Sequence, residues 1–159
     1  MGTGKTETAR ALATRLGRVF VDMDELIEER QGMSISDIFK VKGEPYFRSL
    51  EKALVKELAA RDGLVVSCGG GTFADGGNIT ELKRSGTVIC LTSSPQQILQ
   101  RTKGYHHRPL LNVTDPEALI CGLLEKRAPF YVQAHHQINT DQLTIEETVN
   151  IVLTLVKND

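Results

Sequence analysis

Apolar and polar positions along the chain follow two alternating patterns. Short apolar runs with the period of strands occur at residues 18–22 (RVFVD), 63–68 (GLVVSC), 87–91 (TVICL) and 136–140 (HQINT). Stretches with the helical period lie between and after them, at residues 6–16, 46–61, 95–102, 116–131 and 144–157. Strands that alternate with helices predict a parallel sheet covered on both faces. We therefore expect an α/β protein of three α/β/α layers.

The composition describes one ordinary globular domain. No linker, repeat or low-complexity tract divides residues 1–159, so we expect a single domain. Lys and Arg number 19 against 20 Asp and Glu, and this balance gives no general attraction to nucleic acid or to an anionic membrane. The apolar runs are far shorter than the roughly 20 residues of a membrane helix. We expect a cytoplasmic monomer with neither nucleic-acid nor membrane partners.

The chain opens on MGTGKT, which matches the last six residues of the phosphate-binding pattern G-x-x-x-x-G-K-[ST]. In such a loop the glycines turn backbone N–H groups toward phosphates, the lysine supplies a positive charge, and the hydroxyl of Thr6 is offered to Mg²⁺. An amphipathic helix and then a strand follow, as this motif requires. The candidate nucleotide-binding residues here are Gly2, Thr3, Gly4, Lys5, Thr6 and Glu7.

The start of the chain raises a separate question. A phosphate-binding loop of this kind follows an apolar strand, so we expect the central strand and the first loop glycine to precede Met1 in a record that starts late. The alternatives are a chance run of small residues and an inactive remnant that has lost part of its site. The motifs further along the chain favour the late start.

Two carboxylates follow the strand at residues 18–22. Alternation along a strand would send Asp22 and Asp24 to the same face at its carboxyl end, where ligands of open α/β sheets bind. One carboxylate could hold a metal ion and the other could face a substrate hydroxyl. The alternative is that both, with Glu25, Glu28 and Glu29, simply place negative charge in the first turns of a helix.

Four further motifs follow in order: GEPYFRSLE at 43–51, SCGGGT at 67–72, RPLL at 108–111 and KRAPFY at 126–131. Together with the phosphate loop, they resemble shikimate kinase over essentially the whole chain. The resemblance implies a P-loop kinase fold with a lid at about residues 102–115 and a parallel sheet of five strands, four of them within this chain. It also implies ATP-dependent phosphorylation of shikimate at its 3-hydroxyl, in aromatic amino acid biosynthesis.

The resemblance also assigns residues at the acceptor end, about residues 24–61 and beyond. Arg48 and Arg127 match the arginines that bind the shikimate carboxylate, and bidentate guanidinium groups suit a carboxylate better than a lysine does. Glu51 lies one helical turn after Arg48 and can hold its guanidinium in place. The glycines Gly69, Gly70 and Gly71 let a substrate ring lie against the backbone.

The remaining assignments concern the transferred phosphoryl group. Asp24 matches the carboxylate that meets the acceptor hydroxyl, and Asp22 matches the one that secures Mg²⁺ together with Thr6. In the lid, Arg108 matches the arginine that closes over the phosphates, and Arg101 matches one that stacks on adenine. The resemblance thus gives Lys5, Asp24 and Arg108 as catalytic residues, with ATP as co-substrate.

Two other classes of function compete with this interpretation. One is another small-molecule kinase of the same fold, such as a gluconate kinase or a nucleoside monophosphate kinase. Two separate arginines in GEPYFRSLE and KRAPFY suit an acidic ring better than a neutral sugar. The other is a truncated, inactive nucleotide-binding module, which the expected loss of a strand would favour.

Overall fold

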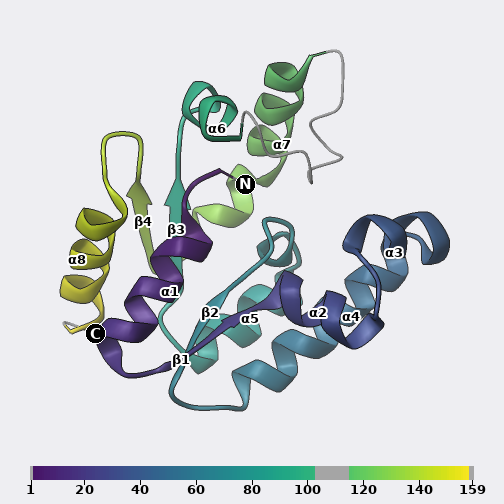
Figure 1. Cartoon of the computed structure of the whole chain (residues 1–159), viewed down its shortest axis with the longest axis horizontal. Helices are drawn as coiled ribbons and strands as arrows, with labels where there is room; N and C mark the ends of the chain where they lie inside the picture. Colours follow the sequence, from purple (N-terminus) through teal and green to yellow (C-terminus); the bar gives the residue numbers. More distant parts are fainter. Residues whose placement is uncertain (1, 103–114, 158–159) are drawn as a thin grey trace.

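The computed structural model describes residues 2–102 and 115–157 (Figure 1). Its strands are β1 (Val19–Asp22), β2 (Leu64–Ser67), β3 (Ile89–Thr92) and β4 (His136–Asn139). Its helices are α1 (Lys5–Leu16), α2 (Met23–Gln31), α3 (Ile35–Lys42), α4 (Glu44–Ala59), α5 (Gly76–Ser85), α6 (Pro95–Thr102), α7 (Pro116–Tyr131) and α8 (Ile145–Val156). A short 3₁₀ helix, η1 (Thr72–Ala74), follows β2. None of the helices in the described ranges is long and apolar enough to cross a membrane.

The strands pair in parallel, as the alternation of strands and helices predicts. β1 pairs with β2 in a register that sets Asp22 opposite Ser67, and β3 pairs with β4. Within the described residues these are two separate pairs, whereas we expected one continuous sheet. The strand that should lead into the phosphate loop, and so lie between two neighbours, is not among the described residues.

Two apolar clusters form the core. One joins α2, α3 and α4 to the β1–β2 pair, and its buried members are Met23, Ile27, Ile38, Phe47, Leu54, Val55 and Leu58. The other joins α1, β4 and α8, and its buried members are Leu12, Ile138, Val149 and Val152. Partly buried Val65 of β2 and Ile89 of β3 pack against this second cluster, which therefore links the two strand pairs.

The segment at residues 24–61 is largely helical, but it contains three helices where the hydrophobic period indicated one. α2 begins directly after β1, because the Asp22 carboxylate accepts hydrogen bonds from the backbone of Asp24 and Glu25. α3 begins at the N-cap Ser34, whose hydroxyl accepts from Asp37 N. Helices this short are marginal on their own in water, so their caps and their packing against the first apolar cluster stabilise them.

We predict that Ile38→Ala lowers the free energy of unfolding by about 2–5 kcal/mol. Ile38 on α3 is 0% exposed within the first cluster, so the substitution removes apolar contacts and leaves a cavity. Val41→Ala is the matched control on the same helix, because Val41 is 73% exposed, and it should change stability by less than about 0.5 kcal/mol. Urea denaturation followed by circular dichroism measures both. Equal midpoints for the two variants would contradict this account of the core.

Candidate active site

The phosphate-loop residues turn tightly into α1. Gly2 and Gly4 have φ angles of 68° and 81°, a conformation that side chains disfavour. A Cβ on Gly2 would also meet Ile98 at 3.2 Å. Lys5 and Thr6 are the first residues of α1, and Thr8 N donates to Gly4 O to close the first turn. The helix N-terminus and Lys5 thus form a place where negative charge is stabilised.

Thr6 lies at the carboxyl ends of β1 and β2. Its hydroxyl donates to Asp22 Oδ2 at 3.0 Å and lies 3.2 Å from the hydroxyl of Ser67. Hydroxyl and carboxylate oxygens are the ligands that Mg²⁺ prefers, so this donor set fits the ion that the sequence predicted at Thr6 and Asp22. Ser67 was not predicted. Its place at the end of β2, opposite Asp22, is set by the strand register.

Strand alternation was expected to place Asp24 on the same face as Asp22, and this prediction was wrong. β1 ends at Asp22, and Asp24 is the second residue of α2. Its carboxylate lies close to the backbone after β2, because a Cβ on Gly69 would be 2.8 Å from Asp24 Oδ1. Burial raises the pKa of Asp24, Lys5 partly offsets this, and Asp22 adds to it. The helix cap, rather than the strand, places this carboxylate near Lys5.

Arg48 on α4 is held by two carboxylates. Its Nη1 donates to Glu51, and its Nε and Nη2 donate to Glu44 Oε1 at 3.1 and 2.9 Å. Glu51 therefore contacts the guanidinium as its spacing predicted. Glu44 was missed, although it stands four residues before Arg48 on the same helix. The guanidinium of Arg48 abuts Gly71, because a Cβ there would lie 2.6 Å from Nη1.

The glycines after β2 form a tight turn into η1. Thr72 N donates to Gly69 O at 3.1 Å, and Ala74 N donates to Gly71 O at 3.0 Å. A side chain at Gly69 or Gly71 would displace the polar ends of Asp24 or Arg48, which lie where its Cβ would be. The structure thus brings the glycine loop, Asp24 and Arg48 together.

Arg127 lies on α7, which also contacts the glycine loop. Tyr131, one turn further along that helix, donates its hydroxyl to Gly70 O at 2.7 Å. Burial raises the pKa of the Tyr131 phenol, and the guanidinium of Arg127 partly offsets the rise, so the two side chains are neighbours. The hydrogen bond of Tyr131 was not predicted from the sequence. A hydrogen bond between residues 61 positions apart leaves no signal in the local pattern.

Arg101 lies near the phosphate loop on the side of α8. It donates to Thr140 Oγ1 at 3.0 Å and to Thr140 O at 2.6 Å. A cavity of about 230 Å³ adjoins it, and the lining residues are Thr3, Gly4, Arg101, Thr140, Leu143, Thr144, Ile145 and Thr148. Its walls are partly apolar and partly hydroxylated, which is suitable for a planar polar ring next to the phosphates. The predicted lid residue Arg108 lies outside the described residues.

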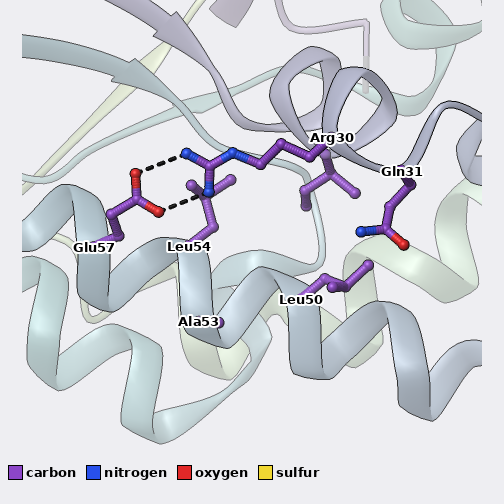
Figure 2. Close-up of a pocket in the computed structure, with 7 residues that line it drawn as sticks. Arg30, Gln31, Leu50, Ala53, Leu54 and Glu57 are labelled. Carbon is purple, nitrogen blue, oxygen red and sulfur yellow. Dashed lines mark hydrogen bonds and ion pairs between the residues drawn. The ribbon is translucent and has the colours of Figure 1, made fainter.

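A second cavity lies between α2 and α4, and Figure 2 shows the side chains around it. Arg30 crosses from α2 and donates to both carboxylate oxygens of Glu57 on α4, at 2.7 and 2.8 Å. Gln31, Leu50 and Leu54 also line the cavity, and none of the predicted site residues does. The ion pair ties the helix that carries Asp24 to the helix that carries Arg48.

Comparison with known proteins gives the same family that the motifs indicated. The family model described as Shikimate kinase matches residues 1–157. A shikimate kinase from Thermus thermophilus is 45% identical over 154 residues, which are 96% of this chain and 84% of that protein. One from Caldanaerobacter subterraneus subsp. tengcongensis is 42% identical over 153 residues, 96% of this chain and 90% of that protein.

A solved structure is similar over nearly the same range. It is a shikimate kinase from Acinetobacter baumannii in complex with shikimate, with a TM-score of 0.94 and 39% identity, and the match covers 99% of this chain and 89% of that one. Family model, relatives and structure all confirm the resemblance found in the sequence. This chain belongs to the shikimate kinase family.

Proposed function

We propose that this chain transfers the γ-phosphoryl group of ATP to the 3-hydroxyl of shikimate at the carboxyl ends of β1 and β2, releasing ADP and shikimate 3-phosphate. One observation carries the proposal: the carboxylate of Asp24 lies beside Gly69 and near Lys5, whose charge offsets part of the rise that burial causes in the pKa of Asp24. The carboxylate of Asp24, which would face the acceptor hydroxyl, therefore lies between the N-terminus of α1 and the residues proposed to bind the acceptor. Family membership supports the choice of shikimate as acceptor.

At the nucleotide end, Gly2, Gly4 and the N-terminus of α1 bind the phosphates, and Lys5 neutralises their charge. Thr6 and Asp22 are the residues that would hold Mg²⁺, whose chemistry is to withdraw charge from the phosphate oxygens. Within the described part of the chain, no group of three or more His, Cys, Asp or Glu could hold a metal. Phosphate oxygens and water would complete the coordination of an Mg²⁺ ion held by Thr6 and Asp22.

At the acceptor end, Arg48 and Arg127 bind the carboxylate of shikimate, and the N–H groups of Gly70 and Gly71 approach the ring. Asp24 accepts a hydrogen bond from the 3-hydroxyl and takes its proton late, since a loose, metaphosphate-like transition state depends more on alignment and charge than on a strong base. We include Arg108, from the lid, as the residue that balances charge on the moving group.

We also propose that the working form of the protein is a cytoplasmic monomer. The large apolar side chains that the described residues expose are spread over the fold: Val19 on β1, Val41 on α3, Val132 after α7, and Ile145 and Ile151 on α8. Scattered apolar side chains of this kind are ordinary for a monomer's surface. Sedimentation with and without substrates measures the assembly state directly.

An acceptor panel tests the proposed reaction. ADP release is followed with shikimate, gluconate and a nucleoside monophosphate as acceptors, each with ATP and Mg²⁺, and the product is identified by ³¹P NMR. We expect release with shikimate alone and a phosphate on the 3-oxygen. Faster release with gluconate or the nucleotide would assign another small-molecule kinase activity. ATP binding without release for any acceptor would favour an inactive nucleotide-binding module.

Asp24→Asn is predicted to lower kcat by about 10²–10⁴-fold, the range for loss of a general base. The amide keeps the size of the side chain but cannot take the proton of the hydroxyl. The KM for ATP should stay within about threefold of its wild-type value. Glu25→Gln is the control, because Glu25 is the next residue on α2 and is exposed. Equal losses of kcat in the two variants would mean that local negative charge, rather than Asp24, matters.

Arg48→Lys is predicted to raise the KM for shikimate by about tenfold or more, while kcat changes little. Lysine keeps the positive charge but cannot contact Glu44, Glu51 and a carboxylate with one planar group. The control is Arg84→Lys on α5, where the arginine is exposed and, among the described residues, pairs with Glu81 on the same helix. Steady-state kinetics at saturating ATP give both constants. An unchanged KM for shikimate in Arg48→Lys would remove Arg48 from the acceptor site.

A further inference from the structure

Behind Arg48 lies a chain of buried hydrogen bonds that the proposed reaction does not use. Asn78 Nδ2 donates to Thr72 O at 3.0 Å, Thr72 Oγ1 donates to Glu51 Oε1 at 2.6 Å, and Arg48 Nη1 donates to Glu51 Oε2. Glu51, Thr72 and Asn78 are only 2%, 0% and 3% exposed. The chain therefore runs from α5, through η1 and α4, to the guanidinium at the acceptor site.

The burial of Glu51 makes each of these bonds consequential. A carboxylate taken out of water must have its oxygens satisfied by donors, and here Thr72 serves one oxygen and Arg48 the other. Removing the Thr72 hydroxyl leaves Oε1 to compete with Oε2 for the guanidinium. Glu51 would then turn, and Arg48 would turn with it.

Thr72 also fixes the glycine loop. Its backbone N–H donates to Gly69 O at 3.1 Å, and it directly follows Gly71, the residue that Arg48 abuts. The backbone of Thr72 thus sets the loop, and its side chain sets the carboxylate that aims Arg48. Thr72 therefore positions both the glycine loop, which the substrate ring would approach, and the guanidinium of Arg48.

We propose that Thr72 is a positioning residue for acceptor binding, acting through Glu51 on the guanidinium of Arg48, with Asn78 holding Thr72 in place. The inference rests on the proposed function, because it takes the acceptor to be an anion bound by Arg48. Thr72 has no role toward ATP in this scheme. Its effect is on the affinity for the acceptor carboxylate and on the preference for acidic over neutral acceptors.

Thr72→Val is the direct test, because valine has nearly the shape of threonine and replaces the hydroxyl with a methyl group that cannot donate a hydrogen bond. We expect a rise of about tenfold in the KM and Kd for shikimate, the size expected for a lost bond to a buried charged group. The kcat and the KM for ATP should stay within about twofold. Thr72→Ser keeps the hydroxyl and should restore wild-type affinity. Thr80→Val on α5 is the matched control, because Thr80 is exposed and its hydroxyl donates to Gly76 O on its own helix, away from Glu51 and Arg48.

A double-mutant cycle separates positioning from a loss of packing. In the Arg48→Ala background, Thr72→Val should add less than about twofold to the KM for shikimate, because its route to the acceptor is already removed. Three results would each overturn the inference. The first is that the rises in KM for shikimate caused by Arg48→Ala and Thr72→Val multiply in the double variant. The others are an unchanged KM in Thr72→Val and a failure of Thr72→Ser to restore affinity. If Thr72→Val does not fold, Thr72→Ala enters the same cycle, since it adds no bulk.

The cycle also distinguishes the inference from the function on which it rests. Wild-type protein that neither binds shikimate in calorimetry nor phosphorylates it would refute the proposed function. Wild-type protein that does both, while the Thr72 and Arg48 variants act independently, would refute only the positioning role of Thr72.

Discussion

The parallel pairing of β1 with β2 is the constraint on which the candidate site depends. Its register sets Asp22 opposite Ser67, so the chain leaves both strands at one edge of the pair. From that edge, Asp22 caps α2, and the glycine loop turns into η1. A shift of the register by one residue would point Asp22 to the other face and separate it from Thr6. The proposed metal-binding Asp22, the carboxylate of Asp24 and the glycine loop are thus all positioned by one short stretch of backbone pairing.

Charge is arranged around that edge so that buried carboxylates are tolerated. Burial raises the pKa of Asp24, the nearby carboxylates of Asp22 and Glu51 raise it further, and Lys5 opposes these effects. Glu51 is stabilised in turn by Arg48 and Thr72. Fixed donors and acceptors of this kind need little rearrangement when charge moves, which is the favourable condition for phosphoryl transfer. The ion pair between Arg30 and Glu57 strengthens the same unit by joining α2 to α4.

The sequence predicted the four strands, five of the helices and the phosphate loop, because period and motif are local signals, and the acceptor arginines stay a prediction of the family resemblance. It missed what depends on contacts between distant segments. The alternation of the strand was expected to continue to Asp24. Instead, β1 ends at Asp22, which caps α2, and that helix begins at Met23. Helices α2, α3 and α5 were not predicted, although α6, which is no longer than they are, was. The residues whose roles appear only through tertiary contacts are Ser67, Thr72, Asn78 and Tyr131. Glu44 pairs with Arg48 one turn along the same helix, so its role was readable from the sequence and was missed.

The central claim is that the anionic end of the acceptor faces Arg48 while its reacting hydroxyl faces Asp24. A crystal structure of the protein with shikimate, ADP and Mg²⁺ tests this most directly. The account predicts hydrogen bonds of about 2.7–3.1 Å from the Arg48 guanidinium to the shikimate carboxylate and from the 3-hydroxyl to Asp24. A carboxylate bound instead at Lys5 and the N-terminus of α1, with the hydroxyl away from Asp24, would contradict it.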